Sequence, residues 1–306
     1  MSATMLQLIQ QATAEMGLSV PNSVAGNTAT DTVQQLALLN AAQYELQREY
    51  DWQKMTIIFQ FQTTFTSTTG DTTDGSAVIT NIPDTTGLSD DYQVQGVGIN
   101  NAAYIESVDS ATQVTMTQPA TATGTGVALT FSQVKYPFPA GFDRVIDRTD
   151  WDKSQHWEML GPETPQQWEW LTSGYISTGP RVRFRLLQGK FQIWPALAAV
   201  HTLGFEYQSK FSVYSAAAAA AGTQPDKQAF TVDTDQSIFP DRLLVLALKR
   251  KYFMVKGFQP IFEKDYMTQL DISKAADGGS ATLSFAPRIS TILIGWENVP
   301  DSSYGS

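Results

Sequence analysis

The sequence predicts an α+β protein: a helical-bundle core of N- and C-terminal helices, with β-hairpin excursions and an inserted small all-β module. Three observations predict this fold class. Apolar residues near both ends of the chain recur every three or four positions, as on amphipathic helices. Through the middle they alternate with polar residues, or form short Val/Ile runs between turn residues. A change in composition also separates residues 66–134 from the sequence on either side.

These patterns divide the 306 residues into four parts. Residues 1–65 hold the N-terminal helices and the first strand of the core. Residues 66–134 form the inserted β-module. Residues 135–279 supply a Trp-rich loop, β-hairpins and the C-terminal helices of the core, and residues 280–306 are an extended C-terminal tail.

Two amphipathic helices are predicted within the first 50 residues. One apolar stripe consists of Met5, Leu8, Ile9, Ala12 and Met16. Gly17 follows it, at the position where a left-handed glycine ends many helices. Asp31 with Gln34 three residues later has the spacing of a capping box and predicts the start of the second helix. The apolar face of that helix consists of Leu36, Leu39, Ala42, Leu46 and Tyr50.

The period changes to two at the segment IIFQFQTTF, which predicts a strand. Five short strands follow in AVITNI, YQVQGVGI, AAYIESV, TQVTMTQ and GVALTFSQV, separated by turn residues. Strands at this spacing are typical of a small sandwich- or barrel-like module. No basic residue lies between Lys54 and Lys135, while seven acidic residues do. This charge shift indicates that 66–134 is a separate, inserted module.

The clearest hairpin lies in residues 181–195. RVRFRL alternates arginine with apolar residues, Gln188-Gly189 makes the turn, and KFQIWP returns. The strand TLGFEYQS at 202–209 is expected to pair beside this hairpin. The polyalanine tract 216–221 predicts either a surface loop or a short helix.

The C-terminal third returns to a helical pattern. IFPD at 238–241 opens a helix whose first turns, LLVLAL, are apolar nearly all round, so this helix is expected to be packed on several sides. Pro260 opens a further helix that ends at Gly278-Gly279. The tail that follows contains an apolar cluster with no predicted partner in the chain, which makes it a candidate partner-binding segment. The cluster consists of Ile292, Leu293, Ile294 and Trp296.

Charge and composition exclude several classes of function. A net charge of −10 argues against a dedicated nucleic-acid binder, which needs a basic face. Only 16% of residues are charged, which suits large protein–protein contacts. The absence of cysteine excludes disulfides, thiolate nucleophiles and cysteine zinc sites. The N-terminus has no basic residue before Arg48 and so does not resemble a signal peptide, and no apolar run reaches the roughly 18 residues of a membrane span.

The segment DWDKSQHWEML, residues 150–160, concentrates residue types that are used in catalysis. His156-x-Glu158 matches half of a zinc-deaminase signature, but the other half needs two cysteines. His201, the second histidine, is too far along the sequence for its spacing to indicate a metal site. The nearby carboxylates alternate with basic residues in DRVIDRTDWDK, which we interpret as a self-paired ionic segment. The sequence therefore predicts no catalytic residue, no cofactor and no metal.

Tryptophans and arginines are the remaining candidates. Trp151, Trp157, Trp168 and Trp170 lie within 20 residues of one another. Tryptophan anchors cores and interfaces, so we interpret all four as anchors of the loop or of a subunit contact, with a carbohydrate-binding row as the alternative. Arg181, Arg183 and Arg185 share one strand face. Pairing with carboxylates, across strands or between subunits, is favoured over contact with nucleic acid.

Three segments in order resemble head-to-tail adaptor proteins of short-tailed bacteriophages, also called connector or tail tubular-like proteins. They are YPFPAGFDRVIDRTDWDKSQHWEMLGPETPQQWEWLTSG, GPRVRFRLLQGKFQIWP and IFPDRLLVLALKRKYFMVKGF. The opening helices, LQLIQQATAEMGL and TVQQLALLNAAQYELQREYDW, are also similar to this family. The resemblance covers most of the chain outside 66–134 and 280–306. The segment 66–134 is similar to a β-module that recurs in phage virion proteins.

The resemblance implies a structural virion protein rather than an enzyme. Family members form a ring, typically of twelve copies, below the portal protein. The ring extends the DNA channel, retains packaged DNA and carries the downstream nozzle or fibre proteins. The expected partners are therefore the portal, neighbouring copies and tail proteins, with DNA passing through without specific binding and with no membrane.

The implied location is the head–tail junction of the virion, after assembly in the host bacterial cytoplasm. Acidic residues of the helices, such as Glu45, Glu49 and Asp51, are candidates for the channel lining, and residues 284–306 for docking on the portal. Two alternatives remain open: a carbohydrate-binding tail protein that uses the tryptophans and the β-module, and a cell-wall hydrolase that uses His156 and the carboxylates.

Overall fold

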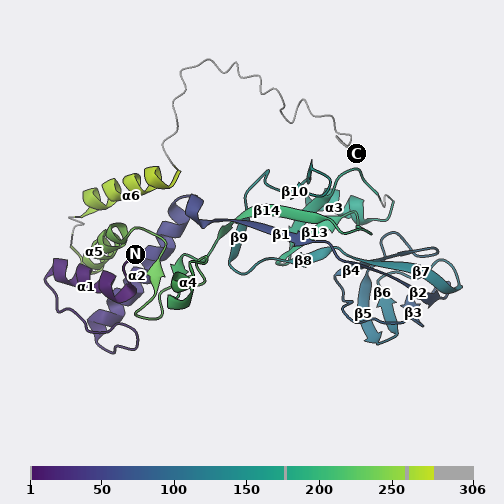
Figure 1. The fold of residues 1–306 in the computed structure, drawn as a ribbon, viewed down its shortest axis with the longest axis horizontal. Helices are drawn as coiled ribbons and strands as arrows, with labels where there is room; N and C mark the ends of the chain where they lie inside the picture. Colours follow the sequence, from purple (N-terminus) through teal and green to yellow (C-terminus); the bar gives the residue numbers. More distant parts are fainter. Residues whose placement is uncertain (1, 176–177, 259–261, 279–306) are drawn as a thin grey trace, which may run out of the picture. The chain divides into compact units, whose positions relative to one another are not determined.

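The computed structural model describes residues 2–175, 178–258 and 262–278, and in this part of the chain it is α+β, with six α-helices and several antiparallel sheets (Figure 1). The chain forms two compact units. The first, here called the helical unit, consists of the residues up to Ile57, Gly141–Val145 and those from Tyr207 onward. The second, here called the β unit, consists of Ile58–Ala140 and Ile146–Glu206.

The helices of the helical unit are α1 (Met5–Met16), α2 (Thr30–Glu49), α4 (Ala216–Ala221), α5 (Asp241–Val255) and α6 (Glu263–Gly278), with a 3-10 turn η1 (Gln53–Met55). Helix α1 confirms the predicted stripe, because Met5, Leu8, Ile9 and Ala12 are fully buried. Gly17 ends α1 with φ of 71°, where a side chain would be strained. The polyalanine tract is helical, and Ser215 caps it through the N–H of Ala218.

The capping box predicted at Asp31 is wrong. Helix α2 begins at Thr30, and its N-cap residue, Ala29, has no side chain that caps it. Asp31 lies inside the first turn, where a carboxylate is favoured by the helix dipole without closing a cap. The loop before α2 is turned instead by Asn27, whose Oδ1 accepts from the N–H of Ala29 at 2.9 Å.

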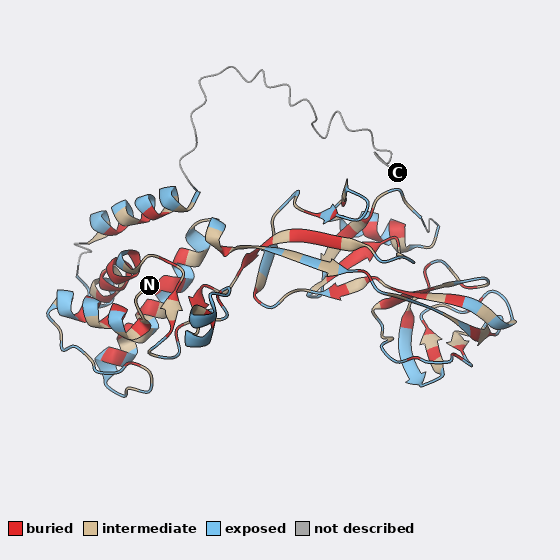
Figure 2. Ribbon diagram, viewed as in Figure 1, coloured by how far each residue is buried: buried red, intermediate tan, exposed pale blue. Residues whose placement is uncertain are grey.

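Helix α5 is the centre of the helical unit. Its residues Leu243–Leu248 are all buried, as the apolar run predicts, and the helix packs against α1, α2 and α6 (Figure 2). Trp52, which follows α2, completes this core: it is fully buried, donates its indole N–H to the carbonyl of Leu46 at 2.6 Å and packs edge-on against Phe239. The helical core is thus built from both ends of the sequence.

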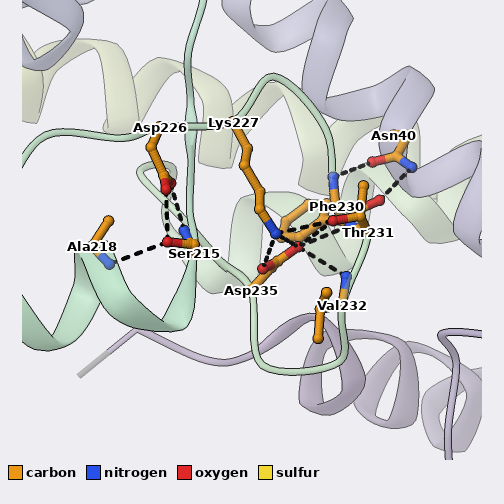
Figure 3. A network of polar contacts seen from close by, with 9 residues as sticks. All are labelled: Asn40, Ser215, Ala218, Asp226, Lys227, Phe230, Thr231, Val232 and Asp235. Atoms are coloured by element: carbon orange, nitrogen blue, oxygen red, sulfur yellow. Dashed lines mark hydrogen bonds and ion pairs between the residues drawn. The ribbon is translucent and has the colours of Figure 1, made fainter.

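A polar network fixes the loop between β15 (Val213–Tyr214) and β16 (Gln236–Ser237) (Figure 3). Asp235 is 1% exposed, and its carboxylate accepts from Lys227 Nζ at 2.8 Å and from the N–H groups of Thr231 and Val232. Asn40 of α2 bonds both the N–H and the carbonyl of Phe230, as a second strand would. The network therefore ties the loop to itself and to α2.

Two sheets contain the strands of the Trp-rich segment and of the hairpin at 181–195. The first has the order β1-β14-β10-β11, with β9 also on β14. Its strands are β1 (Thr56–Gln62), β9 (Phe142–Val145), β10 (Trp151–Asp152), β11 (Trp157–Glu158) and β14 (Thr202–Ser209). The second has the order β12-β13-β8, from β12 (Arg183–Leu187), β13 (Lys190–Trp194) and β8 (Lys135–Pro137).

The hairpin β12–β13 confirms the prediction at 181–195. Gln188 and Gly189 form its turn with φ of 54° and 72°, the left-handed pair that a two-residue hairpin requires. The predicted neighbour of this hairpin, however, is wrong. Strand β14 pairs with β10 and β9, while β8 takes the edge of β13. The two sheets meet by their faces instead, where the rings of Phe191 and Phe205 stack 5.1 Å apart.

The five strands predicted after residue 75 all form, preceded by β2. The six strands are β2 (Phe65–Thr72), β3 (Val78–Ile79), β4 (Tyr92–Gly96), β5 (Ile105–Ser110), β6 (Gln113–Met116) and β7 (Gly124–Gln133), and the last five are the predicted ones. They make two antiparallel sheets, β2-β7-β4 and β3-β6-β5, around one shared apolar cluster that includes Val94, Val114 and Phe131. The further claim that 66–134 is an inserted domain stays a prediction.

Candidate functional site

The Trp-rich segment folds into a short hairpin, with two residues in each strand and a four-residue turn at 153–156, followed by α3 (Pro165–Thr172). Trp151 is in register with Glu158, and Asp152 with Trp157. His156 lies exposed in the connecting turn with φ of 57°, a left-handed conformation that histidine tolerates better than a β-branched residue does. The residue that first suggested a catalytic site is therefore a turn residue.

The second histidine contributes a contact that the sequence did not reveal. His201 Nδ1 lies 2.6 Å from Asp152 Oδ2, although the two residues are 49 positions apart. Asp152 Oδ1 accepts from the N–H groups of Ser154 and Gln155 at 2.9 and 3.2 Å. The backbone of His201 is held as well, because its backbone N–H donates to Thr63 Oγ1 at 2.8 Å and its carbonyl accepts from the backbone N–H of Thr63. Both side chains are thus fixed in position.

The self-paired ionic segment predicted for DRVIDRTDWDK is wrong. Asp152 is engaged by His201, and Arg144 pairs with Asp51, which like Arg144 belongs to the helical unit. Strand geometry explains the error: alternate residues point to opposite faces, so charges that are adjacent in the sequence do not face one another. A cross-strand partner such as His201, two residues before the Leu203 that pairs with Asp152, has no signature in linear spacing.

Asp150, which precedes β10, is 3% exposed, and its Oδ1 has no hydrogen-bond partner among the residues described. Burial raises the pKa of Asp150 to about 7, and the charges of Asp147 and Glu158 add to the shift. A buried carboxyl group of this kind is a proton-binding group near neutral pH. No sequence pattern indicates this group, because burial is a property of the fold.

The Asp152–His201 pair lines a cavity of about 160 Å³ in the β unit. The polar side chains of the wall are Gln155, Glu158 and Arg181, beside Asp152 and His201. Its apolar side chains are Trp157, Pro180, Val182, Pro195 and Leu197. Trp157 is half-buried and lines the cavity. Of the residues predicted as anchors or ionic face, the cavity brings together Trp157 and Arg181.

The other three tryptophans lie apart from this cavity. Trp168 is 7% exposed and packs with Leu171 and Trp194. That burial removes it from a carbohydrate-binding row. Trp151 and Trp170 are 39% and 54% exposed, so they can anchor a contact with another molecule.

The three arginines of the predicted ionic face have different surroundings. Arg183 pairs with Glu163 of the same chain at 2.6 Å, so one member of the face already has an intrachain carboxylate. Arg185 is in register with Gln192 on β13. Arg181 lies at the cavity. Whether the face joins subunits stays a prediction.

The acidic residues proposed for the channel lining are all paired within the helical unit. Glu45 contacts Lys251, Glu49 contacts Lys274 at 3.1 Å, and Asp51 contacts Arg144. The tail cluster Ile292, Leu293, Ile294 and Trp296 lies outside the described residues.

Within the described ranges, no group of three or more His, Cys, Asp or Glu side chains is placed to hold a metal ion. Every helix in the same part of the chain is too short or too polar to cross a membrane. No family model matches this chain, and a search of curated proteins found no match to it.

Proposed function

We propose that the protein is a structural component of a phage virion, a head-to-tail adaptor that forms a ring below the portal. In this role it extends the DNA channel, helps to retain packaged DNA and offers a docking platform to the nozzle or fibre proteins. Its partners are the portal and neighbouring copies of the same chain, in a ring of twelve as in the adaptor family. It acts at the head–tail junction, after assembly in the host cytoplasm, and its work is binding rather than catalysis.

The observation that carries the proposal is the ordered resemblance of three segments to the adaptor family. These segments contribute defined elements: the first supplies β10, β11 and α3, the second the hairpin β12–β13, and the third the buried helix α5. The finer architecture that we propose, a helical-bundle core with β excursions and an inserted β-module, is supported by the separate apolar clusters around α5 and around β7.

Exposed apolar side chains support a role in assembly. In the β unit, Trp170 and Tyr175 are 54% and 85% exposed on and just after α3. In the helical unit, Met254, Val255 and Phe258 are 51–62% exposed at the end of α5. Large apolar side chains gathered at an element end are typical of protein contacts.

The test is assembly with portal rings, followed by negative-stain imaging and sedimentation. The protein alone and the protein with portal are compared, because a ring is expected to close on a template whose symmetry fixes the rotation between copies. Ring-shaped complexes with portal support the proposal. A chain that stays monomeric and does not sediment with portal contradicts it.

Two variants sharpen this test. Deleting 284–306 is expected to weaken co-sedimentation while leaving the melting of the described fold unchanged. Trp170→Ala is expected to weaken ring formation, because an exposed tryptophan contributes more to an interface than to a fold. Val97→Ala, at a site 82% exposed in the β-module, is the matched control and should assemble normally.

A further inference from the structure

We propose that the cavity beside β11 binds one saccharide ring, with Trp157 against its apolar face and Gln155, Glu158 and Arg181 at its hydroxyl groups. The cavity lies entirely within the β unit, and its walls come from the hairpin β10–β11, residues 179–182 and residues 195–201. The proposal depends on this cavity alone. It therefore stands or fails independently of ring assembly.

The cavity has the mixed lining that a sugar requires. A pyranose ring has an apolar face of C–H groups and an edge of hydroxyl groups that both donate and accept hydrogen bonds. Trp157 offers an aromatic surface, and Pro180 and Leu197 extend the apolar wall. Arg181 donates, Glu158 accepts, and Gln155 does both. A pocket with an apolar wall and a few placed polar groups is the usual form of a small-ligand site.

The back of the cavity is rigid before any ligand binds. Asp152 is 2% exposed and fully engaged, by two backbone N–H groups and by His201. His201 is held in turn by its two backbone bonds with Thr63. Because these groups are already ordered, little conformational entropy is lost at the wall when a ligand enters.

The balance of charge disfavours the other small ligands. An anion such as phosphate would meet the carboxylates of Asp152 and Glu158 as well as the guanidinium of Arg181. A metal ion would need a third ligand, and in the described part of the chain no group of three candidate ligands is placed to supply one. A neutral polyol is not repelled by the carboxylates and does not need a third charged ligand.

The volume sets the size of the ligand. About 160 Å³ is below the range of roughly 300–1,000 Å³ that holds drug-sized ligands, so the cavity accommodates one ring rather than a chain. A single ring buries little surface, and we expect weak binding, with a dissociation constant on the order of 1 mM. Weak sites of this kind become effective when copies are linked in one assembly.

The experiment is saturation-transfer NMR on the full chain with methyl glycosides of glucose, galactose, mannose and N-acetylglucosamine, followed by titration of any that respond. At least one pyranoside is expected to receive saturation, strongest on the C–H protons of one ring face. Glycerol is the control for non-specific polyol contact. Inorganic phosphate and calcium are tested as competitors and are expected not to displace the sugar.

Variants assign the site. Trp157→Ala is expected to raise the dissociation constant at least about tenfold, because it removes the stacking surface. Gln155→Ala is expected to raise it about threefold, and because Gln155 is exposed, we expect this variant to fold as the parent does. Val97→Ala, at an exposed site outside the cavity, should leave binding unchanged.

The proposal is overturned if none of the four glycosides receives saturation, or if phosphate or calcium occupies the cavity and displaces the sugar. It is equally overturned if Gln155→Ala and Trp157→Ala, both shown to be folded by their melting curves, bind as the parent does. Should Trp157→Ala fail to fold, Gln155→Ala decides the question alone.

Discussion

At the scale of single residues, two buried aspartates have opposite electrostatic surroundings. Burial disfavours the charge of Asp235, but the hydrogen bond from Lys227 and the N–H groups of Thr231 and Val232 outweigh it and hold the pKa of Asp235 below its usual range. Asp150 has no such donors on Oδ1 and is flanked by acidic residues. The first aspartate therefore stabilises the fold as an anion, and the second does so as a neutral acid.

Asp235→Asn is expected to lower the free energy of unfolding by about 2–4 kcal/mol at pH 7, because it leaves Lys227 without its buried partner. Urea denaturation measures this. Since the folded pKa is depressed, the contribution of the anion is present above the ordinary pKa of aspartate and is lost as the pH falls through the lowered value. The difference between parent and variant should therefore narrow in acid.

The matched control is Asp226→Asn. Asp226 is an exposed aspartate of the same loop that accepts from Ser215, and its replacement should cost less than about 1 kcal/mol. Equal losses at the two positions would contradict the assignment of Asp235 as the centre of the network.

Asp150→Asn is expected to stabilise the protein at alkaline pH. The folded pKa of Asp150, about 7, lies above its ordinary value, so its favourable contribution is complete below the ordinary pKa and is lost as the pH rises through about 7. Melting curves from pH 5 to pH 9 should show the parent losing about 1–2 kcal/mol relative to the variant, a figure reduced for partial solvent screening. A parallel pH dependence of parent and variant would refute the assignment.

In residues 150–160, the sequence shows which chemical groups are present, but it does not show which side chains contact one another. The concentration of His, Asp, Glu and Trp at 150–160 is interpreted as an anchored loop without a site, and the sequence does not predict that residues of this loop line a cavity. The partner of Asp152 could not be foreseen, because His201 reaches it only through the pairing of β10 with β14. The raised pKa of Asp150 likewise depends on burial by residues that are distant in the sequence.

At the scale of elements, local patterns predicted the elements and missed their neighbours. The stripe of α1, the turn at Gln188-Gly189 and the apolar run of α5 depend on contacts within a few residues, which the sequence states directly. The neighbours of β14 depend on which sheet edges are open to it. Both edges of β13 are occupied, one by β12 and the other by β8. Strand order is therefore settled by competition between distant segments.

Capping of the first helix tests this element-scale account. Thr4 Oγ1 accepts from the N–H of Gln7, and Gln7 Oε1 accepts from the N–H of Thr4 at 3.0 Å, so a capping box begins α1. Thr4→Ala is expected to lower the free energy of unfolding by about 1 kcal/mol. Asp31→Asn, at the position where the sequence pattern predicted a cap, should lower the free energy of unfolding by only ~0.3 kcal/mol. Chemical denaturation of both variants distinguishes them, and a larger loss at Asp31 would contradict the account.

At the scale of the whole molecule, the chain builds its cores from segments that are far apart in sequence. The helical core draws on α1 and α2 at one end and on α5 and α6 at the other. The cluster among β2–β7 is instead built from one continuous stretch, from Ile79 to Phe131. A stretch that supplies its own core and whose ends are close together can be removed with the least disturbance to the rest.

Replacing residues 68–132 with a short Gly/Ser linker is therefore expected to leave a cooperatively folded helical unit. The two cut points are close together, because Phe65 pairs with Ser132 and Thr66 with Phe131 in the β2–β7 ladder. The contacts that the shortened chain loses include the ion pair of Asp91 with Lys190 and the hydrogen bond from Asn101 to the carbonyl of Gly174. These residues all belong to the β unit, so the free energy of unfolding of the helical unit should change by less than about 1 kcal/mol. Circular dichroism at 222 nm during heating measures this. A broad, non-cooperative melt would mean that the β-module is integral to the fold, because its removal would then have exposed a core that it shares with the rest of the chain.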